Sequence, residues 1–501
     1  MPFALLSVAA VIALAAYGLN TFLLVALYLR HRQDEIPRPP ALRNPPKVTV
    51  QLPVYNERHV VERIIEAAAG LHYPRNRLQI QVLDDSSDAT SALARRRVAR
   101  MRNMGVDIVW IHRSRRTGFK AGALQEGLAQ ATGEFLAVFD ADFLPPPDFL
   151  EATIPYLVAD PRAALVQTRW SHLNAPASLL TRAQALALDG HFVVEQTARQ
   201  RSGLFMNFNG SGGVWRRACI EAVGGWHHDT LCEDLDLSYR AQLAGWRCLY
   251  LPHVTSPAEL PGHIQALKRQ QFRWAKGSLQ CALKLGPGLL RSRHPWIVRL
   301  QGLIHLTGYL VHPLMLVLLL ASVPILLLGQ PFGLPLAYLS LASLGPPLLY
   351  LLGQRALHED WRRRFARFPG LMLLGTGIAL NNAAAIWEAA TGRPNRFRRT
   401  PKYGGAGKPS GADDYRLPLD ALALGEVGLA GYALLAGWIA SATGALAAIP
   451  FLLLYAAGFG WVGMMSVAEA VRGRRRSLGG LELPRRRRPR GISFLGAARR
   501  H

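Results

Sequence analysis

The sequence predicts an α/β domain combined with an α-helical membrane bundle. Its 501 residues begin with an apolar stretch, continue through a more polar half and become apolar again. In residues 47–260, β-favouring apolar runs alternate with helical segments, which is typical of a mostly parallel sheet covered by helices. The formal net charge of +25 suits a nucleic-acid binder or a membrane protein with a basic cytoplasmic side. No nucleic-acid-binding signature accompanies it, which favours the membrane protein.

The N-terminal stretch is predicted to be the first membrane span. Residues 2–29 are almost wholly apolar and uncharged, which is long enough to cross a bilayer. A cleaved signal peptide would instead need a basic start and a shorter apolar core. The basic residues that follow indicate a cytoplasmic end. We therefore expect a transmembrane helix in residues 1–32 and a Pro-rich linker in residues 33–46.

Strand and helix segments alternate in the first part of the α/β domain. Strands are expected at 48–53, 78–83, 106–112 and 134–142, with helices up to 71, from 90 to 104 and from 120 to 130. In a parallel sheet the carboxyl ends of the strands meet at one edge, which is where such folds bind ligands. The polar residues that follow each strand should therefore meet there.

The fourth predicted strand ends in two carboxylates, Asp140 and Asp142. Residues i and i+2 of a strand point to the same face, and two like charges there repel unless a cation lies between them. Hard divalent ions with oxygen ligands fit this role and usually hold substrate phosphates as well. The pattern predicts a Mg²⁺ or Mn²⁺ site, with a solvated turn as the alternative.

Two other strand ends carry charged residues. Asp84 and Asp85 follow the second strand, where a carboxylate can accept hydrogen bonds from a base or a ribose, although helix capping is an alternative. A basic loop with Arg113, Arg116 and Lys120 adjoins a helix N-terminus, an arrangement that suits a diphosphate. A solvated basic loop is the competing interpretation.

Later segments supply candidates for catalysis and acceptor binding. Asn209 and Gly210 lie in a Gly-rich segment that suits a sugar acceptor or an ordinary turn. Glu233 and Asp234 open a helix, where a carboxylate in a cleft can act as a general base or simply cap the helix.

The amphipathic segment before the membrane, residues 261–296, carries Gln270, Arg273 and Trp274. Tryptophan suits a sugar ring face and arginine suits a pyrophosphate. Both residues are also common as anchors at a membrane interface.

Residues 297–471 are predicted to form the membrane bundle. Spans are expected at 298–328, 334–352, 419–440 and 445–470, which gives about five with the N-terminal helix. The segment 371–390 contains Asn381, Asn382 and Glu388 and is expected to lie at the interface. The positive-inside rule then places the α/β domain, residues 355–418 and a basic disordered tail at 472–501 on the cytoplasmic side.

The acidic motifs occur in the order Asp84-Asp85, Asp140-Ala141-Asp142, Glu233-Asp234 and Gln270-x-x-Arg273-Trp274. This series resembles the processive inverting glycosyltransferases of family 2, the cellulose synthase-like enzymes. The segments DDSSDAT at 84–90 and GRPNRFRRTPKYG at 392–404 are similar to plant-type mannan and glucomannan synthases and their bacterial relatives. Cys232 stands where many members have threonine.

The resemblance implies a GT-A (Rossmann-like) domain at 47–260, a channel-like bundle and a gating-loop region at 392–418. It implies an inverting transfer of a hexose from GDP-mannose or UDP-glucose to a growing β-linked polysaccharide. Asp234 would be the base beside Glu233, and Arg273 would stabilise the leaving diphosphate. The implied donor residues are Tyr55, Glu57, Asp84, Asp85, Lys120 and Asp140; the metal ligands are Asp142 and Asp140; the acceptor residues are Asn209, Gly210, Gln270 and Trp274.

Two other functions compete with this one. A non-processive glycolipid synthase would transfer one sugar to a lipid and would share the first three acidic sites. A transporter with a nucleotide-binding domain would need a P-loop, and the sequence contains none. The favoured hypothesis is an integral membrane protein of a bacterial inner membrane, with several spans and a cytoplasmic catalytic domain.

Overall fold

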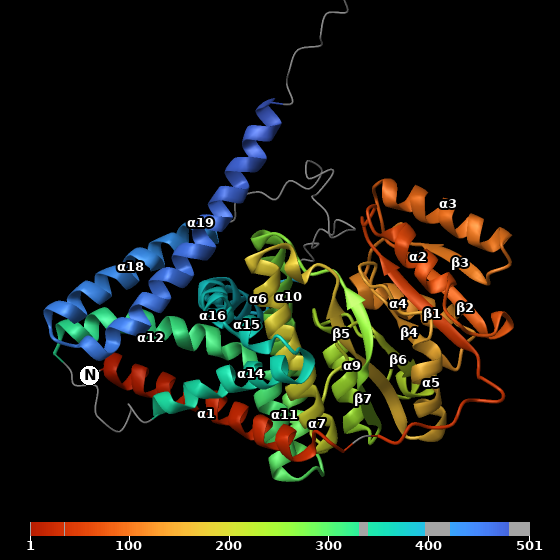
Figure 1. Ribbon diagram of the computed structural model, residues 1–501, viewed down its shortest axis with the longest axis horizontal. Coiled ribbons are helices and arrows are strands. Elements are labelled where there is room, and N and C mark those ends of the chain that lie inside the picture. The colour runs from red at the N-terminus through yellow and green to blue at the C-terminus, as the bar shows by residue number, and fades with distance from the viewer. Residues whose placement is uncertain (1, 35, 330–338, 396–420, 480–501) are drawn as a thin grey trace, which may run out of the picture.

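An α/β domain and a helical bundle lie side by side in the computed structural model (Figure 1). The structure describes residues 2–34, 36–329, 339–395 and 421–479, with only the backbone for 472–479. The combination of an α/β domain with a helical bundle confirms the predicted fold class. Most of the expected gating-loop region at 392–418 lies outside the described residues.

One seven-stranded sheet forms the centre of the α/β domain. Its strands lie in the order β3-β2-β1-β4-β6-β5-β7. The pairs among β1, β2, β3 and β4 are parallel, β6 is antiparallel to both of its neighbours, and β5 is parallel to β7. The strands are β1 Val48–Val54, β2 Leu78–Asp84, β3 Ile108–His112, β4 Phe135–Val138, β5 Ala163–His172, β6 Gly213–Arg216 and β7 Arg247–Ala258.

The first four strands occur where the sequence predicts them, but β4 is shorter than expected. It ends at Val138, so Asp140 and Asp142 lie in the turn that follows rather than in the strand itself. Beyond the strand, the Asp140 N–H donates to the Ser211 hydroxyl, 3.0 Å away, and not to a neighbouring strand. The carboxylates therefore reach the sheet edge through a turn, and the same-face argument for a strand does not apply to them.

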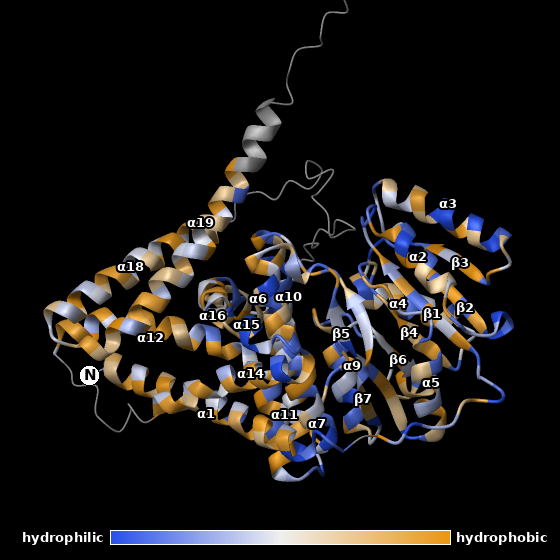
Figure 2. Cartoon of the chain, in the orientation of Figure 1, coloured by the Kyte–Doolittle hydropathy of each residue, from blue (hydrophilic) through white to orange (hydrophobic). Residues whose placement is uncertain are grey.

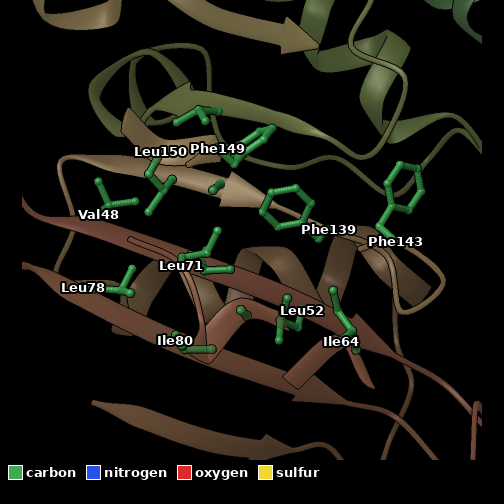
Figure 3. Packing of buried hydrophobic residues seen from close by; sticks show 14 of the residues in the cluster. Val48, Leu52, Ile64, Leu71, Leu78, Ile80, Phe139, Phe143, Phe149 and Leu150 are labelled. Atoms are coloured by element: carbon green, nitrogen blue, oxygen red, sulfur yellow. The ribbon is translucent and has the colours of Figure 1, made fainter. Parts of the chain in front are cut away.

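Helices cover both faces of the sheet, and a separate apolar core lies under each set. The helices are α2 Val61–Ala69, α3 Ala89–Asn103, α4 Phe119–Gln130, α5 Phe149–Ala159, α8 Arg217–Ala222 and α9 Glu233–Leu243. One core contains Val48, Leu52 and Ile80 from the strands with Ile64 and Phe149 from α2 and α5 (Figure 3). The other core lies beneath α4, α8 and α9. Both faces being apolar explains the nearly continuous hydrophobic character of the central strands.

The bundle contains helices from both ends of the chain, and Figure 2 shows how strongly apolar it is. The long helices are α1 Pro2–His31, α10 Ile264–Arg291, α12 Val311–Leu327, α18 Leu422–Ala442 and α19 Ile449–Gly479. Shorter ones are α6 Leu179–Gly190, α7 Thr197–Arg201, α11 Trp296–Leu306, α14 Gly345–Leu357, α15 Trp361–Phe365, α16 Phe368–Gly377 and α17 Ala379–Ala390.

Four helices within the described part of the chain are long and apolar enough to cross a membrane. They cover residues 2–31, 308–327, 422–442 and 446–471, and a bent pair at 361–390 makes up to five. The bend between the two parts of that pair is 40°, where the sequence led us to expect an interfacial helix at 371–390. The expected span at 334–352 falls partly on residues outside the described ranges, and α19 continues into the expected tail.

Candidate active site

A cavity of about 190 Å³ opens at the carboxyl edge of the parallel strands. Its wall comes from the turns after β1, β2 and β4, from the start of α9 and from α10. Every predicted site residue except Asp84 and Arg113 lines it: Tyr55, Glu57, Asp85, Arg116, Lys120, Asp140, Asp142, Asn209, Gly210, Glu233, Asp234, Gln270, Arg273 and Trp274. The fold thus brings together motifs that are spread over more than 200 residues of sequence.

Asp84 and Asp85 are separated by the pleat of β2. The carboxylate of Asp84 is fully buried and accepts hydrogen bonds from Trp110 Nε1 at 3.1 Å and from Ser91, with His112 Nδ1 3.2 Å away. Asp85 lies in the cavity wall, where its two oxygens accept hydrogen bonds from Arg113 at 2.7 and 2.6 Å. Only Asp85 of the two therefore presents a carboxylate to a ligand. Asp84 instead holds Trp110 of β3 and Ser91 of α3 together by hydrogen bonds.

Arg116 lies over the ring of Tyr55, with its guanidinium carbon 3.5 Å from the ring centroid. Burial lowers the pKa of Arg116 to about 10, which leaves it charged at neutral pH. A cation stacked on an aromatic ring beside Asp85 forms a wall that suits a nucleoside and its phosphates. The sequence identified this basic loop but gave no sign that it stacks on Tyr55.

Lys120 lies at the centre of the charged groups. Its Nζ is 2.6 Å from Asp140 Oδ1 and 3.8 Å from Glu233 Oε1, and it donates to the Gly210 carbonyl at 2.7 Å. Burial opposes the charged form, but the attraction of Asp140 and Glu233 outweighs it and raises the pKa of Lys120. A permanently charged ammonium therefore connects the turn after β4 with the start of α9.

Asp234 is the carboxylate best suited to accept a proton. Burial, followed by repulsion from Glu233, raises the pKa of Asp234 to about 7, and Lys120 acts in the opposite direction. Burial also raises the pKa of Glu233. A Cβ at Gly210 would lie 2.9 Å from Asp234 Oδ2, and Gly210 has a φ of +82°. Only glycine leaves room for the carboxylate in this backbone conformation.

Helix α10 closes the cavity on the bundle side with Gln270, Arg273 and Trp274. Burial lowers the pKa of the Arg273 guanidinium, while nearby carboxylates counteract that effect. The helix comes very close to the loop before α9, because a Cβ at Gly277 would lie 2.4 Å from Cys232 Sγ. This close contact fixes α10, and with it Arg273, against the segment that leads into α9, in the same cavity as Lys120 and its acidic partners.

Comparison with known proteins settles the family. A profile of "Glycosyltransferase like family 2" matches residues 45–277. Glucomannan 4-beta-mannosyltransferase 1 of Oryza sativa subsp. japonica is 34% identical over 461 residues, which cover 88% of this chain and 87% of the relative. The chain belongs to this glycosyltransferase family. Other alignments are shorter: glucomannan 4-beta-mannosyltransferase 7 of Arabidopsis thaliana is 42% identical over 50% of this chain, so the chain spans about half the length of several relatives it matches.

The fold has a counterpart among solved structures. The mannosyltransferase PcManGT from Pyrobaculum calidifontis, solved in complex with GDP-Man and Mn²⁺, superposes with a TM-score of 0.54 and 22% identity. The match covers 78% of this glycosyltransferase and all of that chain. It supports the GT-A fold expected from the sequence.

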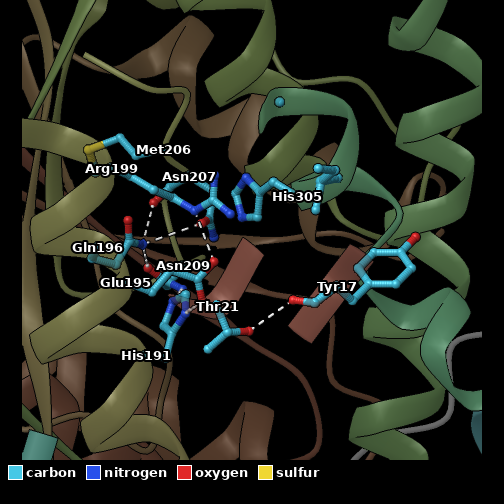
Figure 4. A network of polar contacts seen from close by, with 12 residues as sticks. Tyr17, Thr21, His191, Glu195, Gln196, Arg199, Met206, Asn207, Asn209 and His305 are labelled. Carbon is cyan, nitrogen blue, oxygen red and sulfur yellow. Dashed lines mark hydrogen bonds and ion pairs between the residues drawn. The ribbon is translucent and has the colours of Figure 1, made fainter. Parts of the chain in front are cut away.

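A partly buried polar cluster of the glycosyltransferase holds Asn209 in place (Figure 4). The side-chain nitrogen of Asn209 lies 3.0 Å from His191 Nε2, and the side-chain oxygen of Asn209 accepts a hydrogen bond from Gln196 Nε2 at 2.7 Å. Glu195 contacts both His191 and Arg199, at 3.0 and 2.9 Å. These residues lie on and just after a π-helical turn at 191–196, a feature frequent at functional sites. The i, i+4 spacing of His191, Glu195 and Arg199 was a signal that sequence reasoning missed.

The carboxylates of Asp140 and Asp142 fit a hard divalent cation by their chemistry. Asp142 is 7% exposed and, like Asp140, lines the cavity. Oxygen donors of this kind suit Mg²⁺ or Mn²⁺. Lys120 provides positive charge beside Asp140, so the turn after β4 already carries the electrostatic pattern that a metal-bound diphosphate requires.

A second acidic group lies outside the cavity. Among the described residues, His227, Asp229 and Asp236 are the one group of three potential ligands close enough together to hold an ion. Lys284 of α10 occupies this position: its Nζ lies 3.0 Å from His227 Nδ1 and 2.8 Å from both Asp229 Oδ1 and Asp236 Oδ1. The group is therefore an ionic contact between α9 and α10, and the ammonium serves as its cation.

Proposed function

We propose that this glycosyltransferase transfers a hexose from a nucleoside-diphosphate sugar to a growing β-linked polysaccharide, with inversion at the anomeric carbon. One observation carries the proposal. A half-buried carboxylate with a pKa near 7, Asp234, shares a single cavity with the cations of Lys120 and Arg273. The carboxylate can take a proton, and the cations can balance charge on a departing diphosphate.

The donor lies along the sheet edge in this proposal. Tyr55 and Arg116 form one wall for the nucleoside, and Asp85 supplies a hydrogen-bond acceptor. Asp140 and Asp142 would hold a divalent metal on the diphosphate. When bound, such a metal neutralises charge on the leaving group.

Transfer proceeds by a single displacement. Asp234 takes the proton of the acceptor hydroxyl, and the oxygen forms a bond to the anomeric carbon while the bond to the diphosphate breaks on the opposite face. Lys120 and Arg273 compensate for the negative charge that develops on the diphosphate. A donor with an α linkage thereby gives a β-linked product.

The acceptor lies toward the bundle. Trp274 offers an aromatic face, and Asn209, Gly210 and Gln270 line the same side of the cavity. Retention of the chain beside α10 and its passage into the bundle make the reaction processive. In this arrangement the α/β domain lies in the cytoplasm, and the helices cross a bacterial inner membrane.

The relatives indicate which sugar to test first. The rice relative that aligns with most of this chain is named as a glucomannan 4-beta-mannosyltransferase. Mannose from GDP-mannose is therefore the first proposed substrate, with glucose from UDP-glucose as the second. Both donors present a diphosphate and a ribose to the same cavity wall.

The test uses membrane vesicles that contain the full chain, incubated in parallel with radiolabelled GDP-mannose and UDP-glucose. We expect a labelled polymer with β-1,4 linkages, separated from small products by gel filtration. The matched control is Asp234→Asn, which keeps the size of the side chain, binds the donor and transfers nothing. A product consisting of a single sugar on a lipid would favour the glycolipid synthase instead, and no transfer from either donor would contradict the proposal.

Removal of divalent ions should stop the reaction. Excess EDTA should abolish transfer, and Mn²⁺ or Mg²⁺ should restore it. Asp142→Asn should need a higher metal concentration for half-maximal rate than the wild type, because it loses one ligand charge. Full turnover in EDTA would rule out the metal role of Asp140 and Asp142.

A further inference from the structure

Three acidic residues of the bundle all contact one helix, α10. Helices α17, α18 and α19 each contain a single acidic residue, Glu388, Glu426 and Glu469. Lys276 Nζ lies 3.0 Å from Glu388 Oε2, and Lys268 Nζ lies 2.7 Å from Glu426 Oε1. Three helices that are otherwise free of acidic residues thus each direct their one carboxylate to the same partner.

Glu469 caps the first turn of α10. The helix begins after His263, whose side chain makes no capping hydrogen bond. Instead the Ile264 and Gln265 N–H groups donate to the Glu469 carboxylate at 2.9 and 3.4 Å. A carboxylate at this end satisfies free N–H groups and lies favourably in the field of the helix dipole. The cap of α10 is therefore supplied by α19.

Neither lysine lines the cavity, although both lie on the helix that carries Gln270, Arg273 and Trp274 into it. At about 100° per residue, Lys268 projects about 120–160° away from these three residues. Lys276 lies on the next turn from Arg273, about 60° around the helix. The contacts also bracket the cavity-lining turns, with Lys268 before them and Lys276 after them. Rotation or sliding of α10 would break these contacts and move Arg273 and Trp274 together.

The pair between α10 and α18 is the most deeply buried of the three. The side chains of Lys268 and Glu426 are 1% and 0% exposed, respectively. Desolvation offsets much of the attraction in such a pair, so its presence adds little net stability. Loss of one partner leaves a buried charge without its counterion, and the pair therefore tolerates little displacement.

We propose that Glu426, Glu469 and Glu388 are positioning residues that set the rotation and register of α10. Through them, the membrane bundle determines how Arg273 and Trp274 are oriented in the cavity. This inference rests on the proposed function. It locates part of the control of turnover in helices that do not touch the donor. The sheet edge, which binds the nucleotide, is independent of these contacts.

The test compares steady-state transfer by Glu426→Gln with the wild type in vesicles. We expect kcat to fall at least about tenfold, since a displacement of about 1 Å in a reacting group can cost a hundredfold. The donor KM should stay unchanged, and the product should become shorter because Trp274 faces the acceptor. The exchanged pair, Lys268→Glu with Glu426→Lys, should restore most of kcat.

Asp360→Asn is the matched control. Its carboxylate also belongs to the membrane half, but it pairs with Arg364 at 2.7 Å in an exposed position away from α10. We expect wild-type kcat and product length from it. The inference is overturned if Glu426→Gln folds and keeps the wild-type kcat. It is also overturned if the exchanged pair is no more active than Glu426→Gln, or if Asp360→Asn loses as much kcat as Glu426→Gln does.

A second pair of variants covers the case in which Glu426→Gln does not fold. Glu469→Gln keeps a carbonyl that can accept the helix N–H groups, whereas Glu469→Ala keeps none. A larger loss of kcat in Glu469→Ala, at equal donor KM and thermal stability, supports the inference, and equal wild-type rates in both contradict it. Wild-type vesicles that transfer no sugar would instead overturn the proposed function itself.

Discussion

At the scale of single residues, the site depends on two opposing influences on Asp234. Burial and the neighbouring Glu233 favour its protonated form, whereas Lys120 favours the carboxylate. As the proposed base, Asp234 must be deprotonated before it can accept a proton from the acceptor. With a pKa near 7, Asp234 is both substantially charged at neutral pH and basic enough to be useful.

The first prediction concerns pH. Transfer by the wild type should rise with pH through about 7 and level off above it, because only the deprotonated Asp234 accepts a proton. Glu233→Gln should move this rise to lower pH by removing a repelling charge, and Lys120→Met should move it to higher pH. The pH profile of kcat/KM in the three proteins checks this, and a shift in the same direction for both variants would contradict it.

The second prediction concerns Gly210. Alanine there should lower kcat strongly, since its Cβ would lie 2.9 Å from Asp234 Oδ2. Gly203→Ala is the matched control, because Gly203 also has a positive φ, +66°, but a Cβ there meets nothing within 4 Å. Both variants should lose about 1 kcal/mol of stability, but only Gly210→Ala should lose activity. Equal activity of the two would refute the steric argument.

Nearly all of the site residues that the sequence identified line the cavity, because most of their motifs follow strand ends and strand ends share an edge. Asp84 does not line it, and the reason is the strand pleat. Ile80 and Val82 belong to one core and Leu83 to the other, so Asp84 faces the first core and Asp85 the cavity. A pair of adjacent acidic residues does not show which of them faces the ligand until the side of each strand is known.

At the scale of elements, α10 and the loop before α9 fit together through a glycine. A Cβ at Gly277 would lie 2.4 Å from Cys232 Sγ and 2.7 Å from its backbone nitrogen. Since Glu233 and Asp234 follow Cys232 directly, the separation of these two elements sets the distance from the base to Arg273. The cysteine at this position lies against the glycine.

The third prediction follows from this contact. Gly277→Ala should force α10 away from the loop and lower kcat by about a hundredfold for a displacement of about 1 Å. Gly288→Ala, on the same helix but with nothing near its Cβ, should keep full activity and gain about 0.5–1 kcal/mol of stability. Transfer assays together with thermal unfolding of the two variants check this. Wild-type kcat in Gly277→Ala would show that the contact is not required.

The second half of the sheet was beyond the reach of sequence patterns. Strands β5, β6 and β7 were not predicted, and β6 spans only Gly213–Arg216. Strand β4 is equally short, but its apolar run is bounded by polar residues, whereas β6 directly follows a Gly-rich segment and its antiparallel direction depends on partners far away in the chain. The strands that were predicted are those whose apolar runs are bounded by polar turns.

At the scale of the whole molecule, the charges of the bundle predict its direction in the membrane. Basic residues are frequent in 355–418, and the connector at 441–444 contains none. By the positive-inside rule we propose that the first region faces the cytoplasm and the second faces outside. All four native cysteines are buried, which makes introduced thiols easy to distinguish.

The fourth prediction tests this orientation. A membrane-impermeant maleimide applied to intact cells should label Ser441→Cys, and it should label Asp360→Cys only after the cells are permeabilised. Both positions are exposed in the structure. The unsubstituted chain is the control for background. The opposite labelling pattern would reverse the orientation of the bundle and of the catalytic domain.

The cap that Glu469 provides for α10 has a consequence for biosynthesis. The two partners, Ile264 and Glu469, are 205 residues apart. A ribosome that adds about 5–20 residues per second needs about 10–40 s to travel from one to the other. During that interval the N-terminus of α10 lacks its final partner, so a nascent chain reaches the membrane with the wall of its cavity still incomplete. On the proposed function, α10 gains its final cap, and with it the full support of the cavity wall, only after the last helix has been synthesised.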